Sequence, residues 1–439
     1  MLSLRQCIKE NTIMKERIAV IQGLRSPVAK AYGKLKHIQA DTLGSIIAKE
    51  LVLQIGIDYK EYDEVIIGNV AQPANAANMA RILASRAGFP ISTPAYTVHR
   101  NCASGMQAIS SAIASIHSGE GKLYLVGGVE SMSNIPILYS DNLRNLMIGL
   151  SNSKTILAKL AVLKNFRPNF LKPVIGLVSG LTDPISGQIM GLTAEILANE
   201  FKISKQEQDQ FALNSHLKAQ KATERGILKE EIYPIITSND SIIYDDDGIR
   251  FNQTLKALEK LKPFFDKENG TVSAGNSSQI SDGACMLSIC SESHAKALGI
   301  TPLGYIKDFA YAGLEAHKMG LGPIYATKKL FDKTKIDLKQ IDLIEMNEAF
   351  AAQVIANIKA FDSTQFCQKT FNSAKLGQIN ENLLNVNGGA IALGHPVGMS
   401  GARIVLSALK ELKRRNLQTG LATLCVGGGQ GASFLLEAN

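Results

Sequence analysis

One order of segments occurs twice along the chain and limits the folds that it can adopt. In the first half, "YDEVIIGNVAQ" (62–72) precedes a glycine-marked segment around residue 102, and "GKLYLVGGVES" (121–131) follows it. In the second half, "IDLIEMNEAFAAQ" (341–353) precedes another glycine-rich turn, and "GLATLCVGGGQGASFLLE" (420–437) follows. Each half reads as strand, loop, strand, glycine-rich turn, helix and strand. The sequence therefore predicts two similar α/β units whose turns meet at a shared face.

The length of the chain fits this organisation. Its 439 residues are 45% hydrophobic, lack Trp and contain no long low-complexity tract, which favours a soluble α/β protein with two or more domains. We expect an N-terminal α/β half over 1–133, completed by about 282–302, and a C-terminal α/β half over 303–439. Between them we expect a loop domain over 134–281. Within it, Ser204 and Glu207 have the spacing of a helix capping box.

Charge and cysteine content exclude several classes of protein. The net charge of +8 indicates either a merely basic surface or an anionic ligand, such as one that carries phosphates. Nucleic acid is not expected as a partner, because no basic run is dense and no zinc or aromatic RNA-binding signature is present. The cysteines are too scattered for a disulfide framework or a zinc site, which suggests a reducing compartment. They are Cys7, Cys102, Cys285, Cys290, Cys367 and Cys425.

No stretch of the chain predicts a membrane span or a secretory signal. No segment is long and apolar enough to cross a bilayer. The first 17 residues, "MLSLRQCIKENTIMKER", are basic but lack the apolar segment of a signal peptide. Their two glutamates argue against a mitochondrial presequence. We therefore expect a cytoplasmic protein, with the mitochondrial matrix as the alternative.

Cys102 stands where a predicted strand meets a predicted helix. The preceding "YTVH" alternates like a strand, and Met106, Ile109, Ile113 and Ile116 recur at helical spacing. Unpaired N–H groups in the first turn of a helix stabilise a thiolate, so this position favours a nucleophile. The alternative is a buried structural thiol, which is the usual role of a lone cysteine.

His395 and Cys425 stand at two further glycine-rich turns. His395 precedes a predicted helix, at about the place that Cys102 has in the first half. A neutral imidazole there could accept the thiol proton and later stabilise an oxyanion, although an ordinary loop histidine is the alternative. Cys425 lies between an apolar strand and three glycines, which let the backbone approach a ligand closely. Spacing alone leaves a functional and a structural role equally open for Cys425.

Four motifs carry a resemblance to the thiolase family: "NCASG", "NEAF", "GHPVGMSG" and "CVGGGQG", in this order. Further matches, "GGVESMS", "GLTD", "TVSAGNSS" and "MGLGPIYA", extend the resemblance over nearly the whole chain. It implies an α/β thiolase fold: two similar α/β halves packed as layered sheets and helices, with an inserted loop domain. It also implies a homodimer or homotetramer, coenzyme A as a substrate, and neither a metal nor a permanently bound cofactor.

The resemblance implies a reversible acyl transfer of fatty acid β-oxidation. Coenzyme A would cleave a 3-oxoacyl-CoA to acetyl-CoA and a shortened acyl-CoA, or two acetyl-CoA would condense to acetoacetyl-CoA. Cys102 would carry the acyl group in a ping-pong scheme, and Cys425 would move the proton on the acetyl-CoA carbon. His395 and a water held by Asn347 would stabilise the enolate oxygen. The N–H groups of Cys102 and Gly427 would form a second oxyanion hole.

The same resemblance implies a set of substrate-binding residues. Those expected to hold coenzyme A are Arg250, Leu261, Phe265, Ala274 and Ser278. Those expected to line the pantetheine and acyl path are Leu181, Met190, Met319 and Phe350. For the two methionines, a role as core filling is as well supported by the sequence alone.

The segment 134–180 is longer than in short-chain thiolases and resembles the insertion in β-subunits of the trifunctional fatty-acid oxidation complex. Those subunits usually carry His where this chain has Asn347, so chain length and membership of a complex are left open. Apolar residues recur at roughly helical spacing, with five basic residues and hardly any acid: Leu143, Met147, Leu150, Ile156, Leu160 and Leu163, with Lys154, Lys159, Lys164, Arg167 and Lys172. Two readings follow: a lid over the acyl pocket, or an amphipathic element that docks on a β-oxidation partner subunit or an anionic membrane.

Two rival functions differ from a thiolase in the reactive groups that they need. A carrier-protein-dependent β-ketoacyl synthase would pair its cysteine with two histidines, or with His and Asn, and would not need Cys425. A non-catalytic lipid-binding homologue should have lost some of the reactive groups, whereas this chain has all four: Cys102, Asn347, His395 and Cys425.

Overall fold

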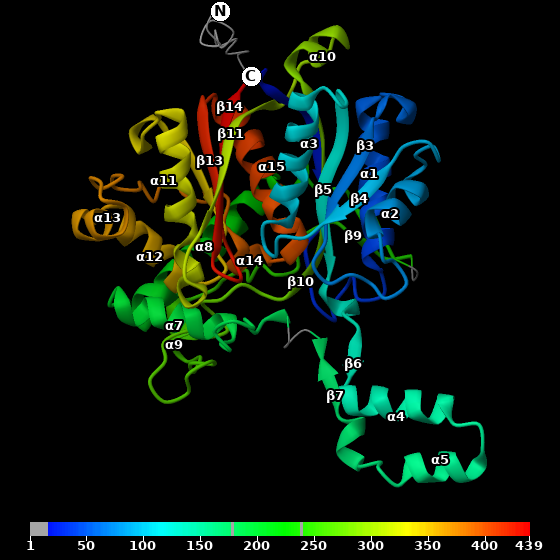
Figure 1. The fold of residues 1–439 in the computed structure, drawn as a ribbon. Helices are drawn as coiled ribbons and strands as arrows, with labels where there is room; N and C mark the ends of the chain where they lie inside the picture. The colour runs from blue at the N-terminus through cyan, green and yellow to red at the C-terminus, as the bar shows by residue number, and fades with distance from the viewer. Residues whose placement is uncertain (1–15, 177–179, 238–239) are drawn as a thin grey trace, which may run out of the picture.

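A ten-stranded sheet runs through the protein, as a computed structural model shows over residues 16–176, 180–237 and 240–439 (Figure 1). The N-terminal stretch, with Cys7 and the question of a leader segment, lies outside the described residues. The strand order is β12-β13-β14-β11-β1-β10-β5-β3-β4, and β2 pairs with β10 at its side. The strands are β1 Ile18–Arg25, β2 Ala29–Lys30, β3 Glu64–Gly68, β4 Ala95–Val98, β5 Leu123–Ser131, β10 Ser281–Ser291, β11 Gly304–Gly313, β12 Leu343–Met346, β13 Thr419–Val426 and β14 Gln430–Ala438.

The sheet consists of two half-sheets that meet at β1 and β11. In the first half, β3 pairs in parallel with β4 and β5, and in the second half β12 pairs in parallel with β13. The halves join where Ile18 of β1 lies opposite Ile306 of β11 in an antiparallel pair. The prediction of two similar α/β units is confirmed. The sequence pattern did not indicate that their strands form one continuous ladder.

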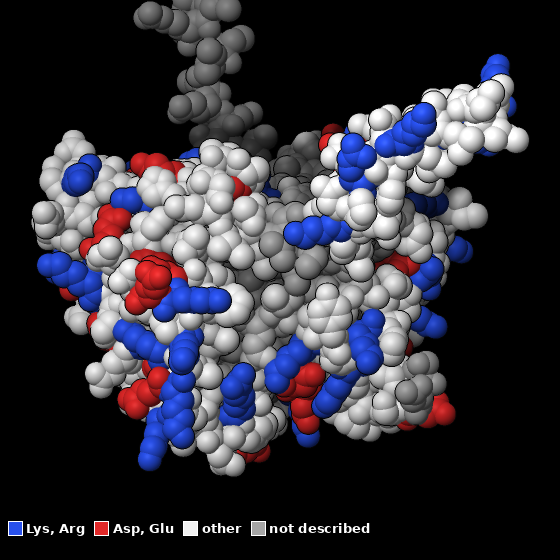
Figure 2. Space-filling model, turned by 90° about the horizontal axis from the view of Figure 1, so that it is seen from below, with Lys and Arg blue, Asp and Glu red and all other residues white. Residues whose placement is uncertain are grey.

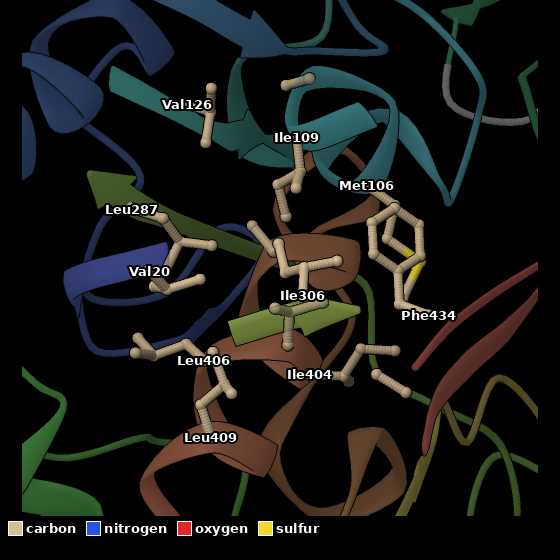
Figure 3. Packing of buried hydrophobic residues seen from close by; sticks show 14 of the residues in the cluster. Val20, Met106, Ile109, Val126, Leu287, Ile306, Ile404, Leu406, Leu409 and Phe434 are labelled. Atoms are coloured by element: carbon tan, nitrogen blue, oxygen red, sulfur yellow. The ribbon is translucent and has the colours of Figure 1, made fainter. Parts of the chain in front are cut away.

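Two helices fill the space between the half-sheets (Figure 1). They are α3, Ser104–Ser118, and α15, Val397–Arg415. Figure 3 shows their apolar side chains packed among residues of both half-sheets. Labelled there are Met106 and Ile109 of α3, Ile404, Leu406 and Leu409 of α15, and Val20, Val126, Leu287, Ile306 and Phe434 of the strands. This central helix layer, flanked by the two half-sheets, contains the largest continuous core.

Glycines bring the first turns of α3 and α15 into contact. A Cβ atom on Gly105 would lie 2.7 Å from the backbone N of Ala402, and one on Gly401 would lie 2.8 Å from the N of Met106. Any larger residue would push the helices apart, so these glycines serve close backbone approach. As a result, the two helices begin side by side, and the loops that precede them are brought together.

Outer helices cover the far faces of both half-sheets (Figure 1). On the first half lie α1, Ala40–Ile55, and α2, Met79–Ala87. On the second half lie α11, Gly322–Thr334, and α12, Ala351–Phe361. The remaining helices of these halves are α10 Glu292–Ala297, α13 Thr364–Phe371 and α14 Ala390–Leu393. The layers thus alternate as helix, sheet, helix, sheet and helix, which agrees with the predicted layered α/β class.

The region between β5 and β10 includes the parts of the chain that lie lowest in Figure 1. Its ordered elements are β6 Ile137–Tyr139, α4 Asp141–Asn152, α5 Ile156–Leu163, β7 Pro173–Ile175, α7 Met190–Glu200, α8 Lys205–Glu224, β8 Ile235–Ile236, β9 Ile242–Ile243 and α9 Leu255–Glu259. Ser204 and Glu207 form the predicted capping box at the start of α8. Residues 137–175, here called the arm, project away from the body. The domain limits 1–133, 134–281 and 303–439 stay a prediction.

A buried ion cluster fastens this region to β1. The guanidinium of Arg25 is fully buried and donates to Glu231 over 2.7 Å and to both carboxylate oxygens of Asp246 over 2.7 and 2.9 Å. Removing one partner of such a group leaves an uncompensated buried charge, at a cost of about 3–5 kcal/mol.

Among the described helices, none is long and apolar enough to cross a membrane.

Candidate active site

Cys102 lies in a tight turn between β4 and α3. The strand ends at Val98, and α3 begins at Ser104, two residues after the cysteine. The Ser104 hydroxyl accepts from the N–H of Arg100 over 2.9 Å and donates to the carbonyl of Asn101 over 2.7 Å. These bonds close the turn, so the prediction of a thiol just before a helix is confirmed.

The Cys102 sulfur is surrounded by groups with opposing effects on its charge. Burial raises the pKa of the thiol, and the charge of Glu130 raises it further. Hydrogen bonds from the N–H groups of Gly427 and of Cys102 itself lower this pKa, but burial outweighs them. The backbone N–H groups thus favour the thiolate, as the sequence predicts, but they do not outweigh burial. The resting group is a thiol, and a base must remove its proton.

Cys425 is the second-last residue of β13, two residues before the turn Gly427–Gly429. It is almost fully buried. Burial raises the pKa of its thiol above the ordinary range, and the charge of Cys102 adds to this effect. The two sulfur atoms are therefore close enough to interact, although they are far apart in the sequence. A neutral, buried thiol beside a second cysteine is suited to donate a proton.

His395 lies between α14 and α15 as a neutral imidazole. Burial lowers its pKa to about 4, and Arg403 contributes to the decrease. The Ser400 hydroxyl donates to the carbonyl of Pro396, and it lies 2.6 Å from Nδ1 of His395. Because the hydroxyl proton is used, Nδ1 must be the donor, and this assigns the tautomer from the hydrogen bonds. Nε2 is then an acceptor, buried and without a partner among the described residues.

Asn347 follows β12 and presents an unused amide. Its backbone N–H donates to Thr423 over 3.0 Å, whereas both polar side-chain atoms are buried without a partner in the described part of the chain. The next residue, Glu348, accepts from Ser215 over 2.6 Å and from the N–H of Ile391 over 3.2 Å. Buried polar atoms normally have partners, so the free amide of Asn347 and the free Nε2 of His395 indicate where a ligand would bind.

Aromatic contacts gather several of the predicted coenzyme A residues. The rings of Phe265 and Phe350 lie 6.0 Å apart in an edge-to-face arrangement. Phe265 also covers Gly191, where a Cβ atom would come within 2.3 Å of the ring. The N–H of Ser278 donates to the carbonyl of Ala349 over 2.9 Å. These contacts connect the loop that carries Phe265, the start of α7 and the "NEAF" turn.

Other predicted binding residues lie around this group or at the surface. Leu261 fills the space over Gly275, where a Cβ atom would lie 2.5 Å from it, and the neighbouring Ala274 is exposed. Arg250 is exposed, and its N–H donates to Nδ1 of His216 on α8 over 3.3 Å. No described contact joins Arg250 directly to the aromatic group.

The residues predicted for the acyl path lie near the Gly427 turn. Sulfur of Met190 would be 3.5 Å from a Cβ atom on Gly427. The carbonyl of Leu181 accepts from the N–H of Met190 over 2.8 Å. Met319, in the short 3₁₀ helix Ala316–Leu321, is buried in the same core cluster as Cys425. This placement leaves the core-filling reading of Met319 open.

Residues that the sequence interpretation did not single out support the reactive groups. Glu130, with a pKa raised to about 7 by burial, accepts from the N–H of Gly398 over 2.9 Å and from the N–H of Ala71 over the same distance. Ser400 fixes the tautomer of His395, and Asn101 contacts the Gly427 turn. Glu130, Ser400 and Asn101 each belong to one of the motifs that carry the family resemblance. Membership of such a motif was the only signal in the sequence that could have indicated their roles.

The face that carries α7, α9 and the arm is basic. Figure 2 shows Lys and Arg side chains predominating over Asp and Glu on this face and along the arm. A basic face attracts anionic ligands and surfaces through its summed field.

Comparison with known proteins gives a consistent result over nearly the whole chain. The family description "Thiolase, N-terminal domain" matches residues 18–293, and "Thiolase, C-terminal domain" matches residues 300–438. A protein of Pseudoalteromonas translucida named 3-ketoacyl-CoA thiolase is 38% identical over 438 residues, which are 98% of this chain and 100% of that protein. A protein of Aliivibrio fischeri with the same name is 39% identical over 425 residues, 96% of either chain.

Solved structures agree with these relatives. The acetyl-CoA acetyltransferase of Bacillus anthracis superposes with a TM-score of 0.84 at 36% identity and covers 97% of this chain and 99% of its own. Human mitochondrial 3-ketoacyl-CoA thiolase in complex with CoA gives a TM-score of 0.83 at 33% identity, with 97% and 98% covered. Family, relatives and fold thus coincide, and the chain belongs to the thiolase family.

Proposed function

We propose that this thiolase cleaves and forms the carbon–carbon bond of a 3-oxoacyl-CoA through an acyl group on Cys102. The observation that carries the proposal is the arrangement of three reactive groups. Burial and the charge of Cys102 raise the pKa of the Cys425 thiol, which supports a site shared by the two cysteines, and the unpartnered Nε2 of the neutral His395 lies in the loop before α15. That loop adjoins the Cys102 turn because α3 and α15 begin side by side.

In the cleaving direction, Nε2 of His395 accepts the proton of the Cys102 thiol. The thiolate attacks the 3-oxo carbon, and the N–H groups of Cys102 and Gly427 donate to the oxygen that becomes negative. The bond between the α and β carbons then breaks, and its electron pair leaves with acetyl-CoA as an enolate. Cys425 gives its proton to the enolate carbon, which releases acetyl-CoA and leaves the acyl group on Cys102.

Coenzyme A completes the cycle by taking the acyl group. The Cys425 thiolate accepts the proton of the coenzyme A thiol, so it regains the proton that it gave to the enolate. The coenzyme A sulfur attacks the acyl carbon, and the bond to Cys102 breaks. The Cys102 sulfur recovers the proton held by His395. The products are a shortened acyl-CoA and an enzyme in its starting state.

In the condensing direction, Cys425 removes a proton from the methyl group of acetyl-CoA. This proton is weakly acidic, so the enolate oxygen needs strong stabilisation. Protonated Nε2 of His395 and a water held by the free amide of Asn347 would supply it. Unused polar atoms on both side chains support this role.

Coenzyme A is the substrate that these residues would hold. Leu261, Phe265, Ala274 and Ser278 belong to the loop beside the "NEAF" turn, and Arg250 stands exposed nearby in the chain. Leu181, Met190, Met319 and Phe350 would line the pantetheine and acyl path. The basic face of Figure 2 favours the approach of a ligand that carries phosphates.

We further propose that the arm docks on an anionic membrane surface. Several of its large apolar side chains are exposed, such as Ile156 at 78% and Leu157 at 80%. Against the single acid Asp141, the arm carries Arg144, Lys154, Lys159, Lys164, Arg167 and Lys172. Apolar groups combined with excess positive charge favour an anionic bilayer. Docking on a β-oxidation partner subunit and closure as a lid are the competing outcomes.

We also propose that the protein forms a homodimer or homotetramer and acts in the cytoplasm, with the mitochondrial matrix as the alternative location.

A thiolysis assay tests the reaction and measures its chain-length preference. The protein is mixed with coenzyme A and 3-oxoacyl-CoAs of 4 to 16 carbons, and the products are separated by chromatography. Acetyl-CoA together with an acyl-CoA shorter by two carbons is the expected result. Folded protein that releases neither product from any of these substrates would contradict the proposed reaction. Carrier-protein substrates used in place of coenzyme A would then point to the synthase alternative.

A further inference from the structure

Asn101, the residue before Cys102, has an unusual backbone conformation. Its φ is +43°, in the left-handed region that side chains with a Cβ rarely adopt. Asparagine tolerates this region better than other residues because its short polar side chain can form local hydrogen bonds. Glycine would adopt the same conformation at lower cost. The presence of a side chain at this position therefore needs an explanation from what the side chain contacts.

The side chain of Asn101 bridges the two loops that carry the thiols. Its Nδ2 group donates to the carbonyl oxygen of Gly427 over 2.7 Å, across 326 residues of sequence. The turn that contains Gly427 begins two residues after Cys425. Asn101 thus connects the start of the Cys102 turn directly to the end of the Cys425 strand.

The Gly427 turn has much conformational freedom of its own. Gly428 and Gly429 both have positive φ values, +84° and +79°, and three consecutive glycines restrict the backbone little. The carbonyl of Gly429 is held by the N–H of Leu314 over 2.8 Å. At the other end of the turn, the bond from Asn101 holds the carbonyl of Gly427.

The N–H of Gly427 points at the sulfur of Cys102, where its hydrogen bond lowers the pKa of the thiol. We propose that Asn101 is a positioning residue that aligns this N–H with the Cys102 sulfur and, after acyl transfer, with the thioester oxygen. The role rests on the proposed function of Cys102 but adds a residue and a contact to it. Asn101 touches neither reacting atom and acts through Gly427.

The expected loss of rate on substitution of Asn101 can be estimated from what an oxyanion-hole donor such as the N–H of Gly427 contributes. Removing one donor of an oxyanion hole costs about 100- to 1,000-fold in rate. Loss of the Asn101 side chain leaves the N–H of Gly427 in place but lets the turn rotate. We therefore expect a smaller loss, about 10- to 100-fold in kcat. KM should change little, because the contact is made to the reacting oxygen rather than to coenzyme A.

Two substitutions separate the hydrogen bond from the backbone conformation. Asn101→Gly keeps the left-handed turn and removes the donor. Asn101→Asp keeps the shape of the side chain but turns a carboxylate oxygen toward the carbonyl of Gly427, so the two oxygens repel each other. Asn416→Gly is the matched control, because Asn416 has φ +55° just after the last residue of α15, at the end of this 19-residue helix that lies opposite to His395.

The first measurement is the rate at which iodoacetamide alkylates Cys102 as a function of pH, read by mass spectrometry. Its outcome does not depend on which acyl substrate the enzyme uses. Asn101→Gly should move the alkylation profile to higher pH, and Asn101→Asp should move it further, while Asn416→Gly leaves it unchanged. Thermal unfolding of all variants is recorded beside it, since a purely structural role would lower the melting temperature without moving the profile.

The second measurement is the kcat of thiolysis, with the burst of acyl-Cys102 formation as its first step. The expected order is wild type, then Asn101→Gly, then Asn101→Asp. Unchanged alkylation profiles and unchanged kcat in both variants would overturn the inference. A shifted profile in an enzyme that shows no thiolysis would support the role of Asn101 and contradict the proposed reaction instead.

Discussion

At the scale of single residues, the two thiols of the site differ in the groups that face them. Cys102 receives hydrogen bonds from two backbone N–H groups, whereas the pKa of Cys425 is raised by burial and by the charge of Cys102. A sulfur that faces N–H donors can carry an acyl group whose oxygen needs those donors. A sulfur in a dry environment beside it can hold and release a proton. This division of roles leads to two opposite predictions for the two cysteines.

Cys102→Ala should remove acyl transfer completely and leave the fold intact. The side chain is half-buried in a turn that the hydroxyl of Ser104 closes, so the turn does not depend on the sulfur. Incubation of the wild type with acyl-CoA should give a mass increase on Cys102 alone. An adduct in the variant, or an adduct on another cysteine in the wild type, would show that the nucleophile is misassigned.

Cys425→Ala should still become acylated at Cys102 but should fail to exchange protons. The methyl protons of acetyl-CoA exchange with deuterated water only if a base removes them, and we assign this step to Cys425. Proton NMR of acetyl-CoA in deuterated water measures the exchange, and Cys367→Ala, at another buried thiol, serves as the control. Exchange at the wild-type rate in Cys425→Ala would mean that another base performs the step.

At the scale of elements, the arm is formed by two helices between a pair of short strands. Helices α4 and α5 cover the stretches where apolar residues recur at helical spacing, so the predicted helices are confirmed. Strands β6 and β7 pair so that Tyr139 lies opposite Pro173. The two ends of the arm therefore meet, and a short linker can replace its helices without disturbing the body.

Deleting residues 141–172 and closing the gap with a short Gly/Ser linker should abolish binding to anionic vesicles. We expect short-chain thiolysis to remain, because α4 and α5 lie outside the body (Figure 1). Co-sedimentation of the wild type should weaken with salt, since exposed charges are screened beyond about 10 Å at 0.1 M ionic strength. A variant with Lys154, Lys159 and Lys164 changed to Glu keeps the helices and is the matched control for charge.

Each other outcome selects one of the competing roles of the arm. Unchanged vesicle binding with an altered chain-length preference would identify the arm as a lid and contradict docking. Binding of a β-oxidation subunit in place of vesicles, lost on deletion, would favour a partner protein over a membrane.

At the scale of the whole molecule, buried titratable groups set the dependence of stability on pH. Burial raises the pKa of Glu345 on β12 to about 8, so the folded protein keeps a proton that the unfolded chain, with an ordinary value near 4.5, has released. Between these values the folded state binds more protons, and its stability falls as pH rises. His216 and His395 act in the opposite sense. Burial lowers both pKa values to about 4, so between pH 6.5 and pH 4 the unfolded chain binds more protons than the folded protein. The stability that these two neutral histidines contribute is therefore lost as pH falls through this range.

We predict that stability decreases between pH 6.5 and pH 8 and that Glu345→Gln removes most of this decrease. One proton released over 1.5 pH units corresponds to about 2 kcal/mol at most. The midpoint of urea unfolding at the two pH values measures it. Glu381→Gln, at an exposed position, is the control and should keep the wild-type difference. A wild-type midpoint that does not change between pH 6.5 and pH 8 would contradict the prediction.

Local signals in the sequence predicted what depends on neighbouring residues. The turn before α3, the capping box of Ser204 and the arm helices belong to this class, because spacing and residue type within a few turns determine them. The contacts of Asn101 with Gly427 and of β1 with β10 join residues hundreds of positions apart. No periodicity within one segment encodes such a pair. Family motifs indicated which loops contain the reactive residues, but they did not indicate which side chains hold these loops in place.

The place of β1 in the sheet has a consequence for how the chain is made. The strands that pair with β1, at residues 18–25, are β10 and β11, which begin at residues 281 and 304. Synthesis from the end of β1 to the start of β10 takes roughly 15 to 50 s at ordinary rates of elongation. During this time the apolar β1 is a nascent segment without a partner on either edge. The ribosome thus delivers the first strand of the molecule long before the neighbours that will enclose it, and slower elongation lengthens its exposure to aggregation and to chaperones.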